Sequence, residues 1–183
     1  MTAPDGRPAA DGRPADEKAR RAAELLFRRP TEADYDRLVR VVDDWWDGRN
    51  LHVMLPRLWL QHFRGTSWLA EDAEGRLAGF LIGFLSPDEP AIAYCHMVAA
   101  DPNLRREGVG RRLYERFFED VRTRGALEVH AVTWPGNRRS VAFHRALGFR
   151  TDDGPGTQVL YGTPARAGYD YGSEDRVVFL REL

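Results

Sequence analysis

The chain has 183 residues, of which 43% are hydrophobic and 11% aromatic, and its formal net charge is -1. This length and composition are those of one globular domain, which buries roughly 70% of the surface of its unfolded chain without needing a metal or a disulfide. A charge so close to zero gives no overall attraction to nucleic acid or to an anionic membrane, so we expect neither as a partner.

Cysteine content and hydropathy indicate the compartment. The single cysteine, Cys95, has no partner within the chain, which excludes a disulfide-stapled scaffold and fits a reducing compartment. The longest apolar stretch, 77–85, is too short to span a membrane. The apolar stretch near the N-terminus is interrupted at 28–30, so we expect no secretory signal. The sequence therefore predicts a cytoplasmic protein.

The first predicted feature is a polar tail. Residues 1–22 repeat Asp-Gly-Arg-Pro among alanines and charged residues, and such a composition cannot bury enough apolar surface to order itself. We therefore predict a disordered tail at 1–22 and a single domain at 23–183. Within the domain, Thr31 and Asp34 match a capping box ahead of an amphipathic helix.

The remaining elements follow from apolar periodicity and from Gly and Pro positions. In chain order we expect a strand at 24–27, helices at 31–48 and 55–63, strands at 67–71, 76–85 and 91–98, a helix at 110–124, a strand at 127–134, a helix at 138–147 and a strand at 176–180. The Gly-, Pro- and Asp-rich stretch 151–174 is long enough to hold a small hairpin, which we place at 158–161. This order favours an α/β fold with a mixed sheet and helices on both faces.

Segment 98–113 carries the strongest functional signal. A strand ends, a turn follows, and Gly108 and Gly110 stand where the next helix begins, so several backbone N–H groups can converge on an anion. The helix dipole and the arginines at 105, 106, 111 and 112 add positive charge. This arrangement suits a phosphate group, although two glycines by themselves are more typical of an ordinary turn capped by solvated arginines.

A second motif follows about 25 residues later and consists of Asn137, Ser140, Phe143, His144, Gly148 and Phe149. Together with Arg-x-x-Gly-x-Gly after a strand that ends in Val-x-x-Asp-Pro, it resembles the GNAT superfamily of acyl-CoA-dependent N-acyltransferases. The resemblance spans about residues 24–180 and implies a GNAT-like sheet, mostly antiparallel, with a splayed parallel strand pair. It also implies an enzyme that moves an acetyl group from acetyl-CoA directly to a primary amine of a small molecule or protein, without a metal.

The resemblance also implies where acetyl-CoA binds. Its pantetheine arm would lie between strands 91–98 and 127–134, bonded to the backbone of Met97 and Val98. Asn137 would contact the pantetheine or cap the helix, and these two roles are compatible. Ser140 fits a ligand contact or an ordinary position on the helix surface equally well. The pyrophosphate would lie on Arg105, Arg106, Gly108, Val109, Gly110 and Arg111.

The candidate catalytic residues are histidines. His144 stands where the family commonly has a tyrosine that protonates the departing thiolate, and an imidazole can also donate that proton. The alternative for His144 is a half-buried packing role. As the general base that takes the proton of the amine, we prefer His96 to His130, because His96 directly precedes the expected pantetheine-binding segment. The five histidines show no metal-ligand spacing.

The acceptor pocket is expected to have aromatic walls, formed by Trp45, Trp46, Asp47, His52 and Trp59 on one side and Tyr161, Tyr169, Asp170 and Tyr171 on the other. This set suits a cationic amine. Trp45 and Trp59 fit the core or a homodimer interface equally well. Two other functions stay open. The replacement of tyrosine by His144 would fit a non-catalytic acyl-CoA sensor, and the arginine cluster would fit a nucleic-acid-binding module, which the near-zero net charge disfavours.

Overall fold

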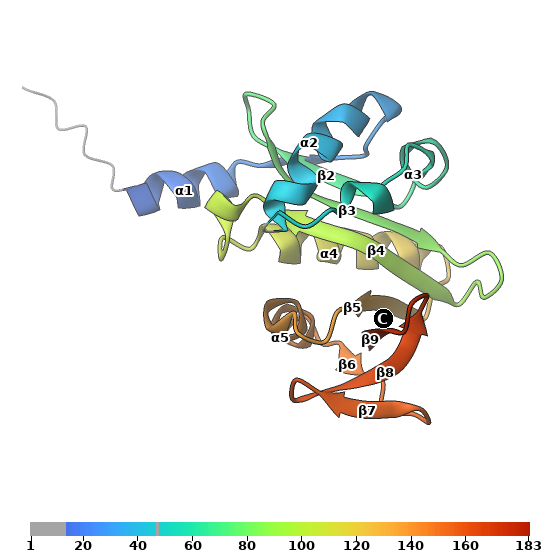
Figure 1. Ribbon diagram of the computed structural model, residues 1–183. Coiled ribbons are helices and arrows are strands. Elements are labelled where there is room, and N and C mark those ends of the chain that lie inside the picture. Colours follow the sequence, from blue (N-terminus) through green and yellow to red (C-terminus); the bar gives the residue numbers. More distant parts are fainter. Residues whose placement is uncertain (1–13, 47) are drawn as a thin grey trace, which may run out of the picture.

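The structure of the protein, a computed structural model, describes residues 14–46 and 48–183. Figure 1 shows its elements in space. The helices are α1 (Pro14–Ala23), α2 (Tyr35–Trp45), α3 (Leu58–His62), α4 (Val109–Thr123) and α5 (Arg138–Ala146), with short 3-10 turns η1 (Glu32–Asp34), η2 (His52–Met54) and η3 (Pro102–Leu104). The strands are β1 (Leu26–Arg28), β2 (Trp68–Glu71), β3 (Leu77–Leu85), β4 (Ile92–Ala100), β5 (Glu128–Thr133), β6 (Arg150–Thr151), β7 (Thr157–Leu160), β8 (Thr163–Asp170) and β9 (Glu174–Glu182). None of the helices in these ranges is both long and apolar enough to cross a membrane.

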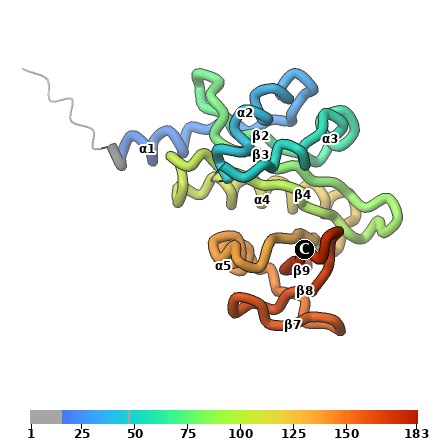
Figure 2. The backbone as a smooth tube through the Cα atoms, viewed as in Figure 1, coloured from blue at the N-terminus to red at the C-terminus, as the bar shows by residue number. Residues whose placement is uncertain are grey.

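The strands form a nine-stranded sheet in the order β1-β2-β3-β4-β5-β9-β8-β7, with β6 paired to β9 off this path. Neighbouring strands are antiparallel except for β4 and β5, which run parallel. The predicted mixed sheet, mostly antiparallel with one parallel pair, is therefore confirmed. The parallel pairing covers only the rows from Ile92↔Glu128 to Cys95↔Ala131, although both strands continue beyond it. Figure 2 shows the chain up to α4 on one side of this divergence and the chain from α5 onward on the other.

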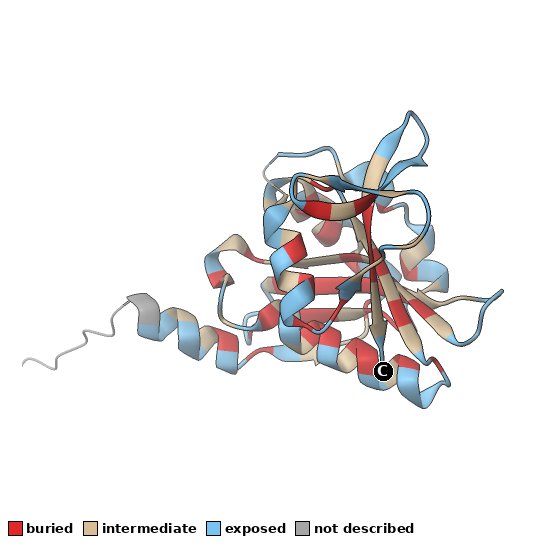
Figure 3. Cartoon of the chain, turned by 90° about the horizontal axis from the view of Figure 1, so that it is seen from below, coloured by how far each residue is buried: buried red, intermediate tan, exposed pale blue. Residues whose placement is uncertain are grey.

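Helices cover both faces of the sheet, as the sequence predicts. On one face, Leu38 of α2 belongs to a core that includes Phe80 of β3. On the other face, α4 packs closely on β3 because two positions of that strand are glycine. A Cβ at Gly79 would lie 2.9 Å from the backbone of β4 and from the side chain of Val109, and a Cβ at Gly83 would lie 2.6 Å from the ring of Phe117. Figure 3 shows the buried residues gathered on the sheet and on the inward helix faces.

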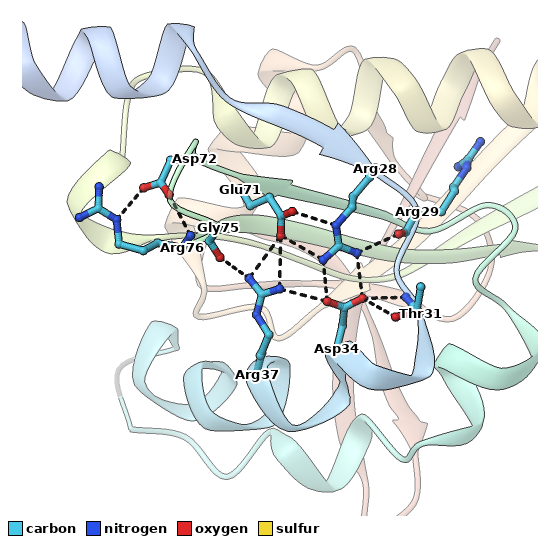
Figure 4. A network of polar contacts seen from close by, with 9 residues as sticks. All are labelled: Arg28, Arg29, Thr31, Asp34, Arg37, Glu71, Asp72, Gly75 and Arg76. Atoms are coloured by element: carbon cyan, nitrogen blue, oxygen red, sulfur yellow. Dashed lines mark hydrogen bonds and ion pairs between the residues drawn. The ribbon is translucent and has the colours of Figure 1, made fainter.

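A network of ion pairs ties the first strand to the second and to the start of α2 (Figure 4). Arg28 binds Asp34 (Nη2–Oδ1 2.7 Å) and Glu71 (Nε–Oε1 2.9 Å), and Arg37 contacts the same two carboxylates. Asp34 also accepts the backbone N–H of Thr31 at 2.8 Å, so the predicted capping box forms. The hydrogen bond from Arg28 is the main reason that the pKa of Asp34 falls to about 2.

The N-terminal segment differs from the sequence prediction. Residues 14–22, predicted to be disordered, belong to helix α1. The composition of this segment gave no reason to expect order, but tertiary contacts supply it. Ala22 is 3% exposed, and Arg21 forms an ion pair with the buried Asp72 at 2.8 Å. The rest of the predicted tail, 1–13, lies outside the described residues.

The late stretch 151–174 also holds more structure than expected. The hairpin predicted at 158–161 is present as β7 and β8, but β8 extends to Asp170 and pairs with β9. Gly162 in the turn has a φ of 79°, a conformation that glycine adopts without strain. The two-residue strand β6 was not predicted, because so short a segment carries no periodicity.

Candidate active site

The turn between β4 and α4 gathers backbone N–H groups at the start of a long helix. Gly108 is the N-cap of α4 in the left-handed conformation, with φ 76°, and no side chain from the described part of the chain caps this end. The first intrahelical hydrogen bond runs from Arg112 N to Gly108 O, so the N–H groups of residues 108–111 precede the helical ladder. A Cβ at Gly108 would meet no atom of the described residues within 4 Å, so this side of the turn is open. The unpaired N–H groups and the helix dipole make this end of α4 suitable for a phosphate group.

The four arginines around this helix end do not all face it. Arg106 and Arg111 are exposed, and Arg111 donates to a carbonyl at the end of α5 at 3.0 Å. Arg105 is half-buried, and its guanidinium donates to the carbonyl of Trp45 at 3.4 Å. Arg112 donates instead to the carbonyl of Ala22 in α1 and lies over the ring of Phe27. The prediction that Arg112 adds its charge to the phosphate-binding turn is therefore wrong, because helical geometry turns this side chain toward α1.

Other motif residues have clear packing roles. A Cβ at Gly110 would lie 3.0 Å from the ring of Phe143, so a glycine here lets α4 and α5 approach each other. Asn137 is the N-cap of α5, as one of its two predicted roles requires, because its Oδ1 accepts the backbone N–H of Ser140 at 3.1 Å. The carbonyl of Ser140 in turn accepts a hydrogen bond from His144.

β4 contains a β-bulge where it separates from β5. In the pairing with β3, Ile82 lies opposite Met97 whereas the next residue, Gly83, lies opposite Cys95. His96 is therefore the extra residue of the bulge. The last paired row with β5 is the row of Cys95, so from His96 onward the edge of β4 that faces β5 has no strand partner among the described residues. Such an edge can bind an extended ligand through backbone hydrogen bonds.

The bulge changes which side chains share a face. His96 stacks on Trp59 of α3 with ring centroids 4.1 Å apart, and Met97 belongs to the core beneath α2 and α3. Val98 packs against the opposite core, beside α4. Regular alternation predicts that Tyr94, His96 and Val98 share one face, and this prediction is wrong for Val98 because the extra residue reverses the alternation.

His96 has one ring nitrogen engaged and the other available. Its Nε2 lies 2.8 Å from the carbonyl oxygen of Met54. A carbonyl only accepts, so Nε2 carries the proton and Nδ1 presents a lone pair. No hydrogen bond to Nδ1 occurs among the described residues. Burial lowers the pKa of His96 below its usual 6.5, so the imidazole is neutral at pH 7 and can accept a proton.

His144 has both ring nitrogens engaged. Its Nδ1 donates to the carbonyl of Ser140 at 2.8 Å, and its Nε2 accepts from the hydroxyl of Tyr114 at 2.8 Å. The ring is 4% exposed and stacks on Phe179 at 4.3 Å. Burial lowers the pKa of His144 to about 4. A neutral imidazole whose only proton is bound to a carbonyl cannot protonate a leaving thiolate, so this geometry argues against the acid role expected for His144.

Tyr114 of α4 was not among the predicted site residues. Its hydroxyl contacts both His144 and the thiol of Cys95, and the side chain is fully buried. Burial raises the pKa of Cys95 to about 12, which keeps this thiol protonated and unreactive. No sequence signal identifies the Tyr114–His144 pair, because the two residues lie on different helices.

The three tryptophans of the first expected wall are half-buried and pack against the core beneath α2 and α3. Trp45 and Trp46 pack on Phe80, with ring centroids 6.1 and 6.0 Å away. Trp59 in addition stacks on His96. His52 is exposed and is held by Asp43 at 2.6 Å, whereas Asp47 lies outside the described residues.

The second expected wall approaches the site through β8. Burial is the main cause that raises the pKa of the Tyr94 phenol, and Tyr169, Cys95 and Asp170 make smaller contributions in the same direction. Asp170 is paired with Arg176 at 2.7 Å. Tyr161 instead packs on Trp134 with ring centroids 5.5 Å apart, and Tyr171 is fully exposed. Tyr94 and Arg176 were not among the predicted site residues. The position of Tyr94 two residues before His96 is the signal that could have identified it.

His130, the second base candidate, lies opposite Tyr94 in the parallel pair. Its Nε2 is 3.0 Å from a carboxylate oxygen of Glu128. Its Nδ1 therefore also presents a lone pair, but His130 lies within the β4–β5 pairing, whereas His96 lies just beyond its last paired row.

Known proteins share this sequence pattern and fold. The profile of the acetyltransferase (GNAT) family matches residues 21–149. The L-2,4-diaminobutyric acid acetyltransferase of Nocardia farcinica is 28% identical over 82% of this chain and 79% of its own length. A [ribosomal protein bS18]-alanine N-acetyltransferase of Salmonella typhimurium is 31% identical over 42% of this chain and 50% of its own. The structure of diaminobutyrate acetyltransferase from Paenibacillus lautus in complex with L-2,4-diaminobutyric acid and coenzyme A has a similar fold, with a TM-score of 0.62 and 20% identity over 87% of this chain and 95% of that one.

Proposed function

Because the chain belongs to the acetyltransferase (GNAT) family, we propose that it transfers the acetyl group of acetyl-CoA directly to a primary amine of a small amino acid or a protein, with His96 as the general base. The chain is an acyl-CoA-dependent N-acetyltransferase; the acceptor and the residue roles are the proposed part. The main observation behind the proposed roles is that the β4–β5 pairing ends at Cys95. His96 follows directly, and the same strand leads into the N-terminus of α4.

The residues present fit acetyl-CoA. The open space in front of Gly108 and the N–H groups of residues 108–111 would hold its diphosphate, with Arg105, Arg106 and Arg111 adding positive charge. The free edge of β4 at Met97 and Val98 would bind its pantetheine arm. Acetyl-CoA supplies an activated acetyl group as a thioester. Asn137 is assigned no direct contact with acetyl-CoA; it stabilises the start of α5 as its N-cap.

The protein groups then act on the amine. An acceptor amine is protonated at neutral pH and must lose a proton to attack a carbonyl carbon. Nδ1 of His96 presents the lone pair that takes this proton, and the Met54 carbonyl and the Trp59 ring hold the imidazole in place. His144 is assigned a positioning role, because Ser140 and Tyr114 occupy both of its nitrogens. Even if His144 is not the catalytic acid, the protein need not be a non-catalytic acyl-CoA sensor, because His96 has the geometry of a general base.

The acceptor is proposed from the relatives and from the charge near Tyr94. A diaminobutyric acid acetyltransferase aligns with most of the chain, so a short diamino acid is the first candidate. Asp170 and Arg176 bind each other at 2.7 Å, and a diamino acid would exchange with this ion pair, its second ammonium group binding Asp170 and its carboxylate binding Arg176. The relative that acts on ribosomal-protein alanine makes a protein N-terminus the second candidate.

The test begins with coenzyme A binding by calorimetry. The wild type should bind saturably, and Gly108→Ala should weaken the affinity about tenfold, because its Cβ enters the space in front of the helix. Gly75→Ala is the matched control, since Gly75 has a φ of 74° and equally open surroundings in the β2–β3 turn. Equal effects of both substitutions would show that only backbone strain was measured.

The second part of the test is thiol release from acetyl-CoA. We expect turnover with L-2,4-diaminobutyrate or a related diamino acid in a panel that also contains alanine-starting peptides and amines without a carboxylate. Coenzyme A binding without turnover across the panel would favour the sensor instead. Tight DNA binding without coenzyme A binding would favour the nucleic-acid module. The cytoplasmic location and the homodimer remain predictions from the sequence.

A further inference from the structure

Helix α1 contacts the turn that is proposed to bind the diphosphate. The Nζ of Lys18 donates to the backbone carbonyl of Arg105 at 2.7 Å and lies 3.6 Å from a carboxylate oxygen of Glu107. The matched region of the GNAT family profile begins at residue 21, so Lys18 lies outside it. This contact is therefore a feature of the present chain that the family match does not account for.

Two further contacts anchor α1 at both ends of the same turn. Before the turn, Arg21 pairs with Asp101 at 3.3 Å, and Asp101 caps η3 by accepting the backbone N–H of Asn103 at 2.8 Å. After the turn, Arg112 in the first turn of α4 donates to the carbonyl of Ala22. These contacts anchor the last turn of α1 on both sides of the 105–108 turn, and Lys18, three residues before Arg21, lies over Arg105.

The bond from Lys18 fixes the orientation of one peptide group. The 105–106 peptide is planar and trans, so its carbonyl and the N–H of Arg106 point in opposite directions. With the carbonyl held toward α1, the N–H of Arg106 points away from α1. Arg106 then has φ 74° although it is not glycine, and Gly108 follows with φ 76°. Closely spaced left-handed residues turn their backbone N–H groups into an anion-binding concavity.

A left-handed residue other than glycine is strained, and such a conformation persists only when its surroundings hold it. Lys18 is the side chain bonded to the peptide at which this strain begins. We propose that Lys18 is a positioning residue for the acetyl-CoA site: by holding the Arg105 carbonyl, it keeps the turn 105–108 in the conformation that binds the diphosphate before the coenzyme arrives. The proposal rests on the proposed function, because it assigns Lys18 to that same site.

The experiment is a calorimetric titration of the full-length protein with coenzyme A. Lys18→Met keeps the length of the side chain and removes the donor. Since the bond is charge-assisted but one-third exposed, we expect the Kd for coenzyme A to rise about three- to tenfold. Arg20→Met is the matched control, because it removes the same charge from an exposed position of the same helix and should leave the Kd within about twofold.

Three readouts separate positioning from general stability. Lys18→Arg, which keeps a charged donor, should restore most of the affinity. In steady-state kinetics the KM for acetyl-CoA should rise in Lys18→Met while the KM for the amine does not change. Hydrogen exchange without ligand should become faster at residues 105–108 and stay unchanged in β3 and β4. A uniform loss of protection across the sheet would mean that Lys18 only stabilises the fold, and would overturn the proposal.

A double-mutant cycle tests the route through the 105–106 peptide. Glycine adopts a positive φ without strain, so Arg106→Gly should reduce the effect of Lys18→Met on the Kd to less than about twofold. An undiminished effect in the glycine background would overturn this route. If the wild type binds coenzyme A and Lys18→Met binds it equally well, the inference on Lys18 fails while the proposed function stands. If the wild type binds no coenzyme A, the proposed function itself fails.

Discussion

Two histidines near the end of the β4–β5 pairing have opposite surroundings. His96 lies in the bulge of β4 under α3, with one nitrogen on a carbonyl and the other free of hydrogen bonds within the described chain. His144 lies in α5 among aromatic rings, with one nitrogen on a carbonyl and the other on the hydroxyl of Tyr114. Both imidazoles are neutral at pH 7, because burial lowers the pKa of each. Of the two, only His96 has a nitrogen lone pair without a hydrogen bond, and this difference is the reason that we propose His96, and not His144, as the base.

The largest expected effect is the loss of kcat in the variant His96→Gln. Its amide can still donate to the Met54 carbonyl, but it has no basic nitrogen, so kcat should fall about 100-fold or more. Single-turnover measurements with acetyl-CoA and the best amine at saturation test this prediction. Coenzyme A binding should not change. In the wild type the acid limb of kcat/KM should have its midpoint below 6.5, and this limb should be absent from the variant. A rate within about threefold of the wild type would remove His96 as the base.

The next effect is a loss of unfolding free energy at acid pH that comes from His144. Its pKa is about 4 in the folded protein and about 6.5 in the unfolded chain, so its contribution is complete above pH 6.5 and is lost as the pH falls toward 4. The loss at pH 4 amounts to about 3 kcal/mol of unfolding free energy. Urea unfolding at pH 7.5 and pH 4.5 measures it, and in His144→Phe the difference between the two pH values should shrink by most of this amount.

A further loss should follow at lower pH from the carboxylates. The pKa of Asp34 is lowered to about 2, mainly by Arg28. Burial alone would raise the pKa of Asp72, but hydrogen bonds from Arg76 and Arg21 outweigh it and lower the value to about 2. Their contribution is complete above the unfolded value of 3.8 and is lost between 3.8 and 2. Loss of stability confined to this lower window would contradict the assignment of the first window to His144.

A smaller effect is expected from His144→Phe at neutral pH. The hydroxyl of Tyr114 loses its acceptor, which should cost about 1–3 kcal/mol of unfolding free energy. If His144 has only the proposed positioning role, the single-turnover rate should stay within about threefold of the wild type. The variant Tyr114→Phe/His144→Phe should recover part of the lost stability, because no hydroxyl is then left unpaired. A large rate loss in a stable His144→Phe protein would restore the acid role.

The smallest effect is expected from His130→Gln. His130 is half-buried, and unlike His96 it lies within the β4–β5 pairing and not beyond its end. We expect kcat within about twofold and unfolding free energy within about 1 kcal/mol of the wild type. This variant is the matched control for His96→Gln, because both remove an imidazole from neighbouring strands of the same sheet. If the two variants lost activity equally, the environment would not distinguish these residues.

The sequence predicted the sheet, the helices and the helix end at Gly108, because these features depend on local periodicity and on Gly and Pro positions. Asn137 could be predicted as a cap for the same reason. The bulge at His96 could not, since it appears only in the register with β3. The burial of His144 depends on Tyr114, which is 30 residues away along the chain. Helix α1 was missed because its order comes from distant partners such as Asp72.

The short parallel pairing has a mechanical consequence. The backbone link between β4 and β5 consists of four paired rows, and beyond them the two edges part. A coenzyme bonded along the free edge of β4 would extend the hydrogen-bonded contact beyond these four rows and connect the two strands where they diverge. Saturation with coenzyme A should then slow amide exchange in β4 beyond Cys95 and raise the melting temperature of the whole chain. The ligand would thus be a temporary part of the scaffold as well as a reactant.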